Sequence, residues 1–133
     1  MMFNSTELIE SLFVSIKLDN LVDVETLVTL YDVMLEEKYN GYTPLQFASA
    51  YGRIKIVEFF LDHIEDDDES FRNASIALHE AVKYNHFTMV RFLLIYGADP
   101  NTRDIYGQSP LQVAFESGHL GIIQYLIRFD AVL

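Results

Sequence analysis

The sequence has no cysteine and no tryptophan, and it has only three prolines and six glycines in 133 residues. Without cysteine, neither a disulfide framework nor a thiolate metal site can form. No apolar run approaches the roughly 18 residues that a membrane-spanning helix requires. The first ten residues carry two glutamates and no basic residue, which is a poor match to a signal peptide. We therefore expect a protein of the cytoplasm, with the nucleus as an alternative.

Basic residues are also scarce, because nine Lys and Arg stand against 20 Asp and Glu, for a net charge of −11. This charge repels the phosphates of nucleic acids and the surface of anionic membranes, so neither is expected as a partner. It favours a soluble protein whose partner carries a basic patch. Hydrophobic residues make up 50% of the chain, which is enough to give residues 1–133 the core of a single domain.

Similar residues recur along the chain at a spacing of 33 positions. Three sets share this spacing: Leu45, Leu78 and Leu111; Ala48, Ala81 and Ala114; and Val57, Val90 and Ile123. One step earlier, the register falls on Leu12, Ser15 and Val24, which are also apolar or small. The spacing predicts four units, at approximately residues 7–38, 39–71, 72–104 and 105–133, with the first degenerate.

Each unit has the pattern of two short helices. In the second unit, Thr43 is a suitable N-cap, Pro44 suits the first helical position, and Gly52 suits the end of the helix. A second, more apolar helix follows at 54–62. Helices this short are marginal in water unless they stack on neighbours. The sequence therefore predicts an all-α solenoid of four helix–turn–helix units.

Four motifs resemble the ankyrin-repeat family: GYTPL at 41–45, ALHEA at 77–81, GADPN at 97–101 and GQSPL at 107–111. The resemblance extends over about residues 7–131. It implies non-catalytic binding of other proteins through a concave face made of hairpin fingers and the first helix of each unit. The Gly-Ala-Asp stop is missing at 31–35 and 64–68, so the fingers there are expected to be irregular.

The residues give no indication of catalysis. The resemblance implies that His79 bonds the adjacent loop, and His86 and His119 lie at the junctions between paired helices, so we interpret all three as structural. In HEAVKYNH, the two histidines are seven positions apart, whereas a zinc protease helix needs a spacing of four. There is no phosphate-binding loop and no nucleophile elbow. We expect no enzyme activity, no metal and no cofactor.

The positions that would face a partner flank the opening glycine of each unit and the end of its first helix. They include five of the eight tyrosines, a residue type that is frequent in binding hot spots. The predicted partner-binding residues are Tyr39, Asn40, Tyr42, Tyr51, Arg72, Asn73, Ser75, Lys83, Tyr84, Ile105, Tyr106, Gln108 and Glu116.

An acidic run at 62–69 (DHIEDDDE) is expected to form a solvated finger. The predicted acidic finger is Glu65, Asp66, Asp67, Asp68 and Glu69. Three interpretations remain open for it: a flexible, solvated loop, a contact for a Lys- and Arg-rich partner, or weak calcium binding. The run lacks the alternating ligands and the turn glycine of an EF-hand loop.

Because the repeats account for the whole sequence, we expect the protein to act by occupying the surface of a partner, as an inhibitor or competitor. Richness in Asn, Ile, Tyr, Phe and Asp is typical of AT-rich genomes and adds the hypothesis of a viral or pathogen effector in the host-cell cytoplasm. The alternative is an assembly subunit that forms a homodimer through its C-terminal end. That end is rich in apolar residues: Ile122, Ile123, Tyr125, Leu126, Ile127 and Phe129.

Overall fold

A computed structural model describes residues 4–31 and 35–132. These residues contain eight helices and no strand, apart from an isolated bridge between Tyr39 and Tyr42. The helices are α1 (Ser5–Lys17), α2 (Leu21–Leu30), α3 (Pro44–Ala50), α4 (Ile54–Asp62), α5 (Asp67–Lys83), α6 (Phe87–Tyr96), α7 (Pro110–Ser117) and α8 (Leu120–Arg128). None of these helices combines the length and the apolar character that crossing a membrane would require.

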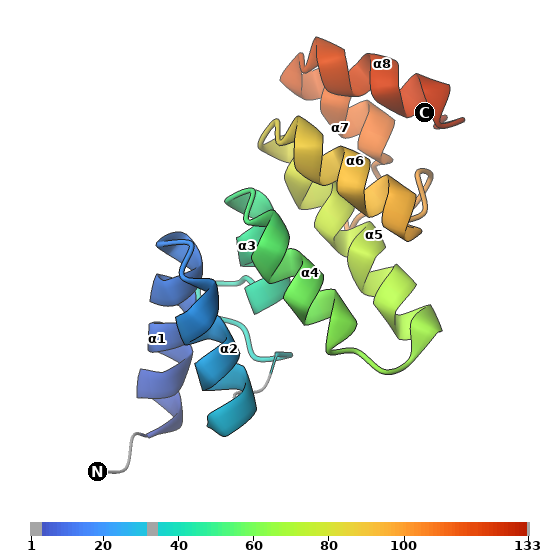
Figure 1. Cartoon of the computed structure of the whole chain (residues 1–133). Coiled ribbons are helices and arrows are strands. Elements are labelled where there is room, and N and C mark those ends of the chain that lie inside the picture. Colours follow the sequence, from blue (N-terminus) through green and yellow to red (C-terminus); the bar gives the residue numbers. More distant parts are fainter. Residues whose placement is uncertain (1–3, 32–34, 133) are drawn as a thin grey trace.

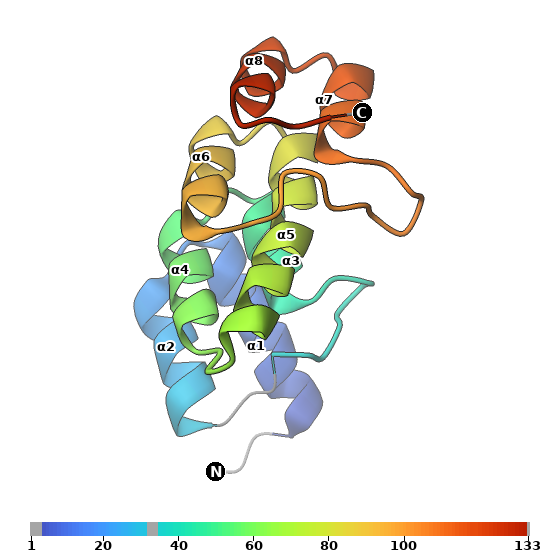
Figure 2. The same ribbon diagram turned by 90° about the vertical axis from the view of Figure 1, so that its right-hand side faces the viewer.

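The helices form two layers of a stack (Figure 1). One layer contains the first helix of each pair, so that α1, α3, α5 and α7 pack side by side, and the second layer contains α2, α4, α6 and α8. Two loops, at residues 35–43 and 97–109, project on the side of the first layer (Figure 2). The predicted all-α solenoid is confirmed, and its first layer and loops form one continuous face.

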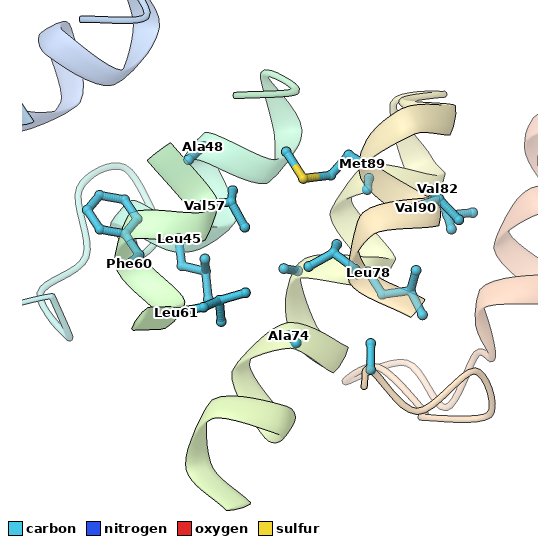
Figure 3. Packing of buried hydrophobic residues seen from close by; sticks show 14 of the residues in the cluster. Leu45, Ala48, Val57, Phe60, Leu61, Ala74, Leu78, Val82, Met89 and Val90 are labelled. Atoms are coloured by element: carbon cyan, nitrogen blue, oxygen red, sulfur yellow. The ribbon is translucent and has the colours of Figure 1, made fainter. Parts of the chain in front are cut away.

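The 33-residue register places equivalent residues in equivalent environments. Leu45, Leu78 and Leu111 are all buried, with exposed fractions of 7%, 0% and 4%. In Figure 3, Leu45 and Leu61 extend from one pair of helices toward Leu78 of the next, in a core that is continuous between the units. Because each helix pair buries its apolar stripe on its neighbour, the units depend on one another for stability.

The turn between the paired helices also repeats. Asp19, Gly52, Asn85 and Gly118 occupy the same position in the four units, and all have positive φ, at 57°, 71°, 62° and 73°. This left-handed conformation favours glycine, and asparagine and aspartate tolerate it best among the other residues. The degenerate first unit therefore keeps the same turn with Asp19.

Hydrogen bonds at the helix N-termini follow the prediction. The Thr43 side chain accepts a bond from the Gln46 backbone N–H, and the Gln46 side chain accepts one from the Thr43 N–H. Ser109 and Gln112 form the same capping box at the start of α7. A proline follows both caps, at a position where a missing N–H costs nothing.

A second repeated hydrogen bond joins successive units. His86 Nε2 lies 2.6 Å from the Ala50 carbonyl oxygen, and His119 Nε2 lies 3.2 Å from that of Lys83. Arg53 occupies the equivalent position one unit earlier and donates from Nη2 to the Lys17 carbonyl oxygen at 2.5 Å. These carbonyls end the first helix of each preceding unit, where intrahelical partners are lacking. The structural interpretation of His86 and His119 is confirmed.

The third unit departs from the predicted pattern, because α5 has 17 residues and begins at Asp67. The predicted boundary between residues 71 and 72 falls inside this helix. Ala74 and Ala77 replace the glycine and the proline that open the second and fourth units, so nothing in this segment interrupts a helix. Only residues 63–66 separate α4 from α5, and the finger expected there is absent.

Candidate functional site

The hairpin loop, residues 35–43, reverses direction at Asn40 and Gly41. These residues have φ values of 54° and 85°, and the backbones of Tyr39 and Tyr42 exchange hydrogen bonds of 2.9 and 3.2 Å. Two central residues with positive φ define the tight turn for which Asn-Gly is preferred. The loop therefore fixes Tyr39 and Tyr42 at its end, as expected for a finger.

Five aromatic residues, Tyr39, Tyr42, Phe47, Tyr51 and Tyr84, form what we call the aromatic surface. The Phe47 ring lies 4.7 Å from that of Tyr51 and 6.2 Å from that of Tyr42, measured between centroids. The hydroxyl oxygens of Tyr42 and Tyr84 are 3.3 Å apart, which links the hairpin loop to the end of α5. The structure thus places Tyr42 and Tyr51 against Phe47 and links Tyr84 to Tyr42.

The aromatic surface rests on a buried ring of α1. Phe13 lies 4.9 Å from Phe47 and 5.2 Å from Tyr39, between ring centroids. Phe13 therefore supports one ring from α3 and one from the hairpin loop, and restricts the freedom of both side chains. Tyr51 and Tyr84 remain 38% and 42% exposed, which leaves large apolar areas open to a partner.

Two cations border the aromatic surface. The Lys83 ammonium lies 5.4 Å from the centroid of the Tyr84 ring, and the Arg53 guanidinium carbon lies 5.8 Å from that of Tyr51. Both distances are within the range of cation–π contacts. Lys83, predicted as a partner-binding residue, is exposed at the last position of α5.

Glu80 lies on α5, about one turn before its C-cap residue, Tyr84. Its side chain is half-buried, and its Oε2 atom is buried without a hydrogen-bond partner. Burial raises the pKa of the Glu80 carboxyl above its ordinary value of 4.5, although the Lys83 charge opposes the shift. The hydrogen bond between the Tyr42 and Tyr84 hydroxyls is the largest cause of a raised pKa for Tyr42, so this phenol is neutral at physiological pH.

The long loop, residues 97–109, holds the predicted residues of the fourth unit. Asp104 Oδ1 accepts hydrogen bonds of 2.9 Å from the backbone N–H groups of Tyr106 and Gln108, which folds the tip of the loop. Ile105 and Tyr106 are highly exposed at that tip. The Gln108 amide donates to both carboxylate oxygens of Glu116 at 2.8 Å, so these two predicted residues satisfy each other.

The predicted residues of the third unit do not form a finger tip. Arg72, Asn73 and Ser75 lie on α5, and Ser75 is buried. The Ser75 hydroxyl donates to the Phe71 carbonyl oxygen and accepts from the Asp99 N–H, both at 2.9 Å. The expectation of an exposed Ser75 is therefore wrong, because the hydroxyl joins α5 to the long loop. Arg72 is exposed and Asn73 is half-buried.

The acidic run also has a different structure from the solvated finger that we expected. Asp66 caps α5 by accepting a 3.1 Å hydrogen bond from the Glu69 N–H, and Asp67, Asp68 and Glu69 form the first helical turn. Acids in this position interact favourably with the positive end of the helix dipole. The acids thus begin a helix, with Glu65 as the last residue before the cap.

The remaining histidines have structural positions. His79 is buried, and its Nε2 lies 3.0 Å from the Thr102 carbonyl oxygen, so the expected bond to the adjacent loop is confirmed. Burial lowers the pKa of His79 below its ordinary value of 6.5, with the Asp104 carboxylate opposing the shift. His63 is the C-cap of α4, where a positive charge would favour the helix dipole.

The C-terminal end exposes two positions that are buried in the preceding units. Ile127 is 53% exposed, whereas the equivalent Leu94 and Leu61 are 3% and 1% exposed. Phe115 is also exposed, whereas Val82 at its equivalent position is buried. Of the apolar residues predicted there, Ile122, Ile123 and Leu126 are buried, and Tyr125 and Phe129 are half-buried.

A family model that describes ankyrin repeats (3 copies) matches this chain at residues 4–104 and again at 65–132. The chain belongs to the ankyrin-repeat family. Ankyrin repeats make it a protein–protein interaction module, and the family is generally non-catalytic.

Similar ankyrin-repeat sequences occur in proteins of different kinds. An ankyrin repeat protein of Rickettsia felis is 30% identical over 122 residues, which cover 92% of this chain and 30% of that protein. Protein phosphatase 1 regulatory subunit 27 of Homo sapiens is 33% identical over 115 residues, which cover 71% of this chain and 75% of the subunit. In potassium channel AKT1 of Arabidopsis thaliana, 33% identity extends over 72 residues, or 8% of the channel.

Two residues of the site were missed from the sequence. Phe47 and Glu80 occupy equivalent positions in consecutive units, next to Ala48 and Ala81 of the repeat. The sequence indicated this position by its variability, because it holds an aromatic residue in the second unit, an acid in the third and Val113 in the fourth. A position that varies in this way on the first helix is a candidate for contact with a partner.

Proposed function

We propose that this ankyrin-repeat chain is an inhibitor or competitor that binds a partner protein through the face formed by its first helices and loops. The observation that supports this most is the aromatic surface. Tyr51 and Tyr84 are partly exposed, yet Phe47 and the Tyr42 hydroxyl hold them in place. Pre-positioned tyrosines lose little conformational entropy on binding, which favours affinity.

The action that we propose is steric. A partner covered by the aromatic surface would be unable to present the same area to its other ligands, and no chemical step is required. The net charge of −11 favours a partner with a basic patch, because opposite charges accelerate the encounter. The proposed compartment is the cytoplasm, and a host factor is the proposed target if the protein comes from a virus or another pathogen.

Affinity capture with matched variants tests this function. The full chain and the Tyr51→Ala/Tyr84→Ala variant are compared with Ile95→Ala, which removes an exposed apolar side chain from α6 in the other layer. We expect each tyrosine to contribute about 1–3 kcal/mol to binding. A protein retained by the full chain and by Ile95→Ala, but lost with the double tyrosine variant, would support the proposal. Equal calorimetric affinities of that protein for all three would contradict it.

The second candidate function is self-association through the C-terminal end. The exposure of Ile127 and Phe115, at positions buried in the preceding units, favours it. A second copy that stacked there would cover the same apolar positions that units of one chain cover for each other. Sedimentation at increasing concentration should then show a dimer, and Ile127→Ser should return it to a monomer. A monomer at all concentrations would exclude this alternative.

A further inference from the structure

A groove of about 520 Å³ lies beside the hairpin loop. Leu35, Leu45 and Ile64 provide apolar parts of its lining, and Glu36, Glu65 and Glu69 contribute carboxylates. Its size is within the roughly 300–1,000 Å³ of sites that bind small ligands and single side chains. No member of the aromatic surface lines it.

The groove exists because the second finger is missing. The chain passes from α4 to α5 through residues 63–66 alone, and the run that would have formed a finger is the N-terminal part of α5. In Figure 2, the hairpin loop lies to the right of the beginning of α5 and the end of α4. The lining residues come from these three segments, from the linker at 63–66 and, with Leu45, from the start of α3.

The charge around the groove is strongly negative. Glu36, Glu65 and Glu69 are exposed, and within residues 4–31 and 35–132 their carboxylates form no ion pair. Asp66, Asp67 and Asp68 follow Glu65 directly. The positive end of α5 offsets only about half of one elementary charge. A groove with acids at its edge and apolar residues inside is complementary to an apolar side chain flanked by cations.

We propose that this groove binds an extended peptide segment of a protein, in which a leucine or phenylalanine enters the groove and flanking lysines or arginines pair with Glu36, Glu65 and Glu69. The site lies apart from the aromatic surface and does not depend on the proposed function. Binding by the flanking cations would be screened by salt, while the apolar contact would persist.

Fluorescence anisotropy with the full chain tests the proposal. The probe is a labelled nonapeptide, Ala-Lys-Arg-Ala-Leu-Ala-Arg-Lys-Ala, and the control peptides replace its leucine by serine or its four cations by glutamate. Glu65→Gln/Glu69→Gln removes two groove carboxylates. Its matched control is Glu10→Gln/Glu25→Gln, which makes the same change at exposed positions of α1 and α2. Asn73→Trp places a large side chain in the groove itself.

We expect the leucine peptide to bind, and each control peptide to bind at least about tenfold more weakly. Glu65→Gln/Glu69→Gln should weaken binding about five- to tenfold, and Glu10→Gln/Glu25→Gln less than twofold. Tyr51→Ala/Tyr84→Ala should leave binding unchanged, which separates this site from the aromatic surface. Equal effects of the two double glutamine variants, or equal binding of the serine peptide, would overturn the proposal even if Asn73→Trp fails to fold.

Discussion

Gly52 and Gly118 allow the contact between successive units to be measured separately from backbone strain. The two glycines are equivalent in the register and have φ values of 71° and 73°. A Cβ added at Gly52 would lie 2.8 Å from Nδ1 of the His86 ring, whereas one added at Gly118 would meet nothing within 4 Å. Alanine at either site adopts the same disfavoured φ, but only at Gly52 must a neighbouring unit move.

The expected losses of stability follow from the backbone strain and from the displacement of the His86 ring. Left-handed backbone costs a non-glycine residue about 1 kcal/mol, so Gly118→Ala should lower the free energy of unfolding by that amount. Gly52→Ala carries the same cost and also displaces the His86 ring, whose bond to the Ala50 carbonyl oxygen contributes about 1 kcal/mol. The expected loss for Gly52→Ala is therefore about 2 kcal/mol.

Urea unfolding of both variants, of His86→Ala and of the double variant Gly52→Ala/His86→Ala gives the required comparison. In the double variant the added methyl group has no ring to displace. The stability loss of the double variant should therefore be about 1 kcal/mol smaller than the sum of the losses of Gly52→Ala and His86→Ala. In thermal melts, 1 kcal/mol corresponds to roughly 4 °C for a chain of this size. Equal losses for Gly52→Ala and Gly118→Ala, with no coupling to His86, would refute the reasoning.

Three further changes test local features by urea unfolding. Because the pKa of Glu80 is raised in the folded state, its contribution to stability is present below pH 4.5 and is lost as the pH rises through the folded-state pKa. Glu80→Val should therefore stabilise the protein by about 1 kcal/mol at pH 7 and by much less at pH 4. A constant gain would contradict the burial of Oε2. The lowered pKa of His79 means that stability falls as the pH drops below 6.5, and His79→Gln should remove this part of the pH dependence. Thr43→Ala removes a capping box and should cost about 1 kcal/mol, whereas an unchanged midpoint would mean that the cap contributes nothing.

The sequence was sufficient for the repeated parts of the fold. The 33-residue spacing predicted the buried positions of Leu45, Leu78 and Leu111, because a stack of similar units places equivalent residues in equivalent contacts. The capping boxes at Thr43 and Ser109 depend on residues only three positions apart, so local sequence determined them as well.

The third unit could not be predicted from the repeat. The register aligned residues 64–76 with the finger segments of the other units. That alignment did not take into account that Ala74 and Ala77 replace the glycine and the proline of the other units. That change and the cap at Asp66 let α5 extend, which buries Ser75 and removes a finger. The groove results from this missing finger, so the 33-residue repeat could not predict it either.

The aromatic surface was predicted in part. Its four tyrosines follow from the register, which placed them among the positions expected to face a partner. Phe47 was missed because its contacts with Phe13 and Tyr42 join different segments of the chain. Its contact with Tyr51 follows from an i, i+4 spacing that could have indicated it. Its contact with Phe13 on α1 became evident only from the packed side chains.

Amide hydrogen exchange of the full chain, alone and in complex with a captured partner, tests the central claim most directly. If the aromatic surface is the binding site, slower exchange on binding should concentrate in residues 39–51 and 80–84. The second-layer helices α4 and α6 should exchange as they do in the free chain. Protection confined to α4 and α6, with residues 39–51 and 80–84 unchanged, would contradict the account.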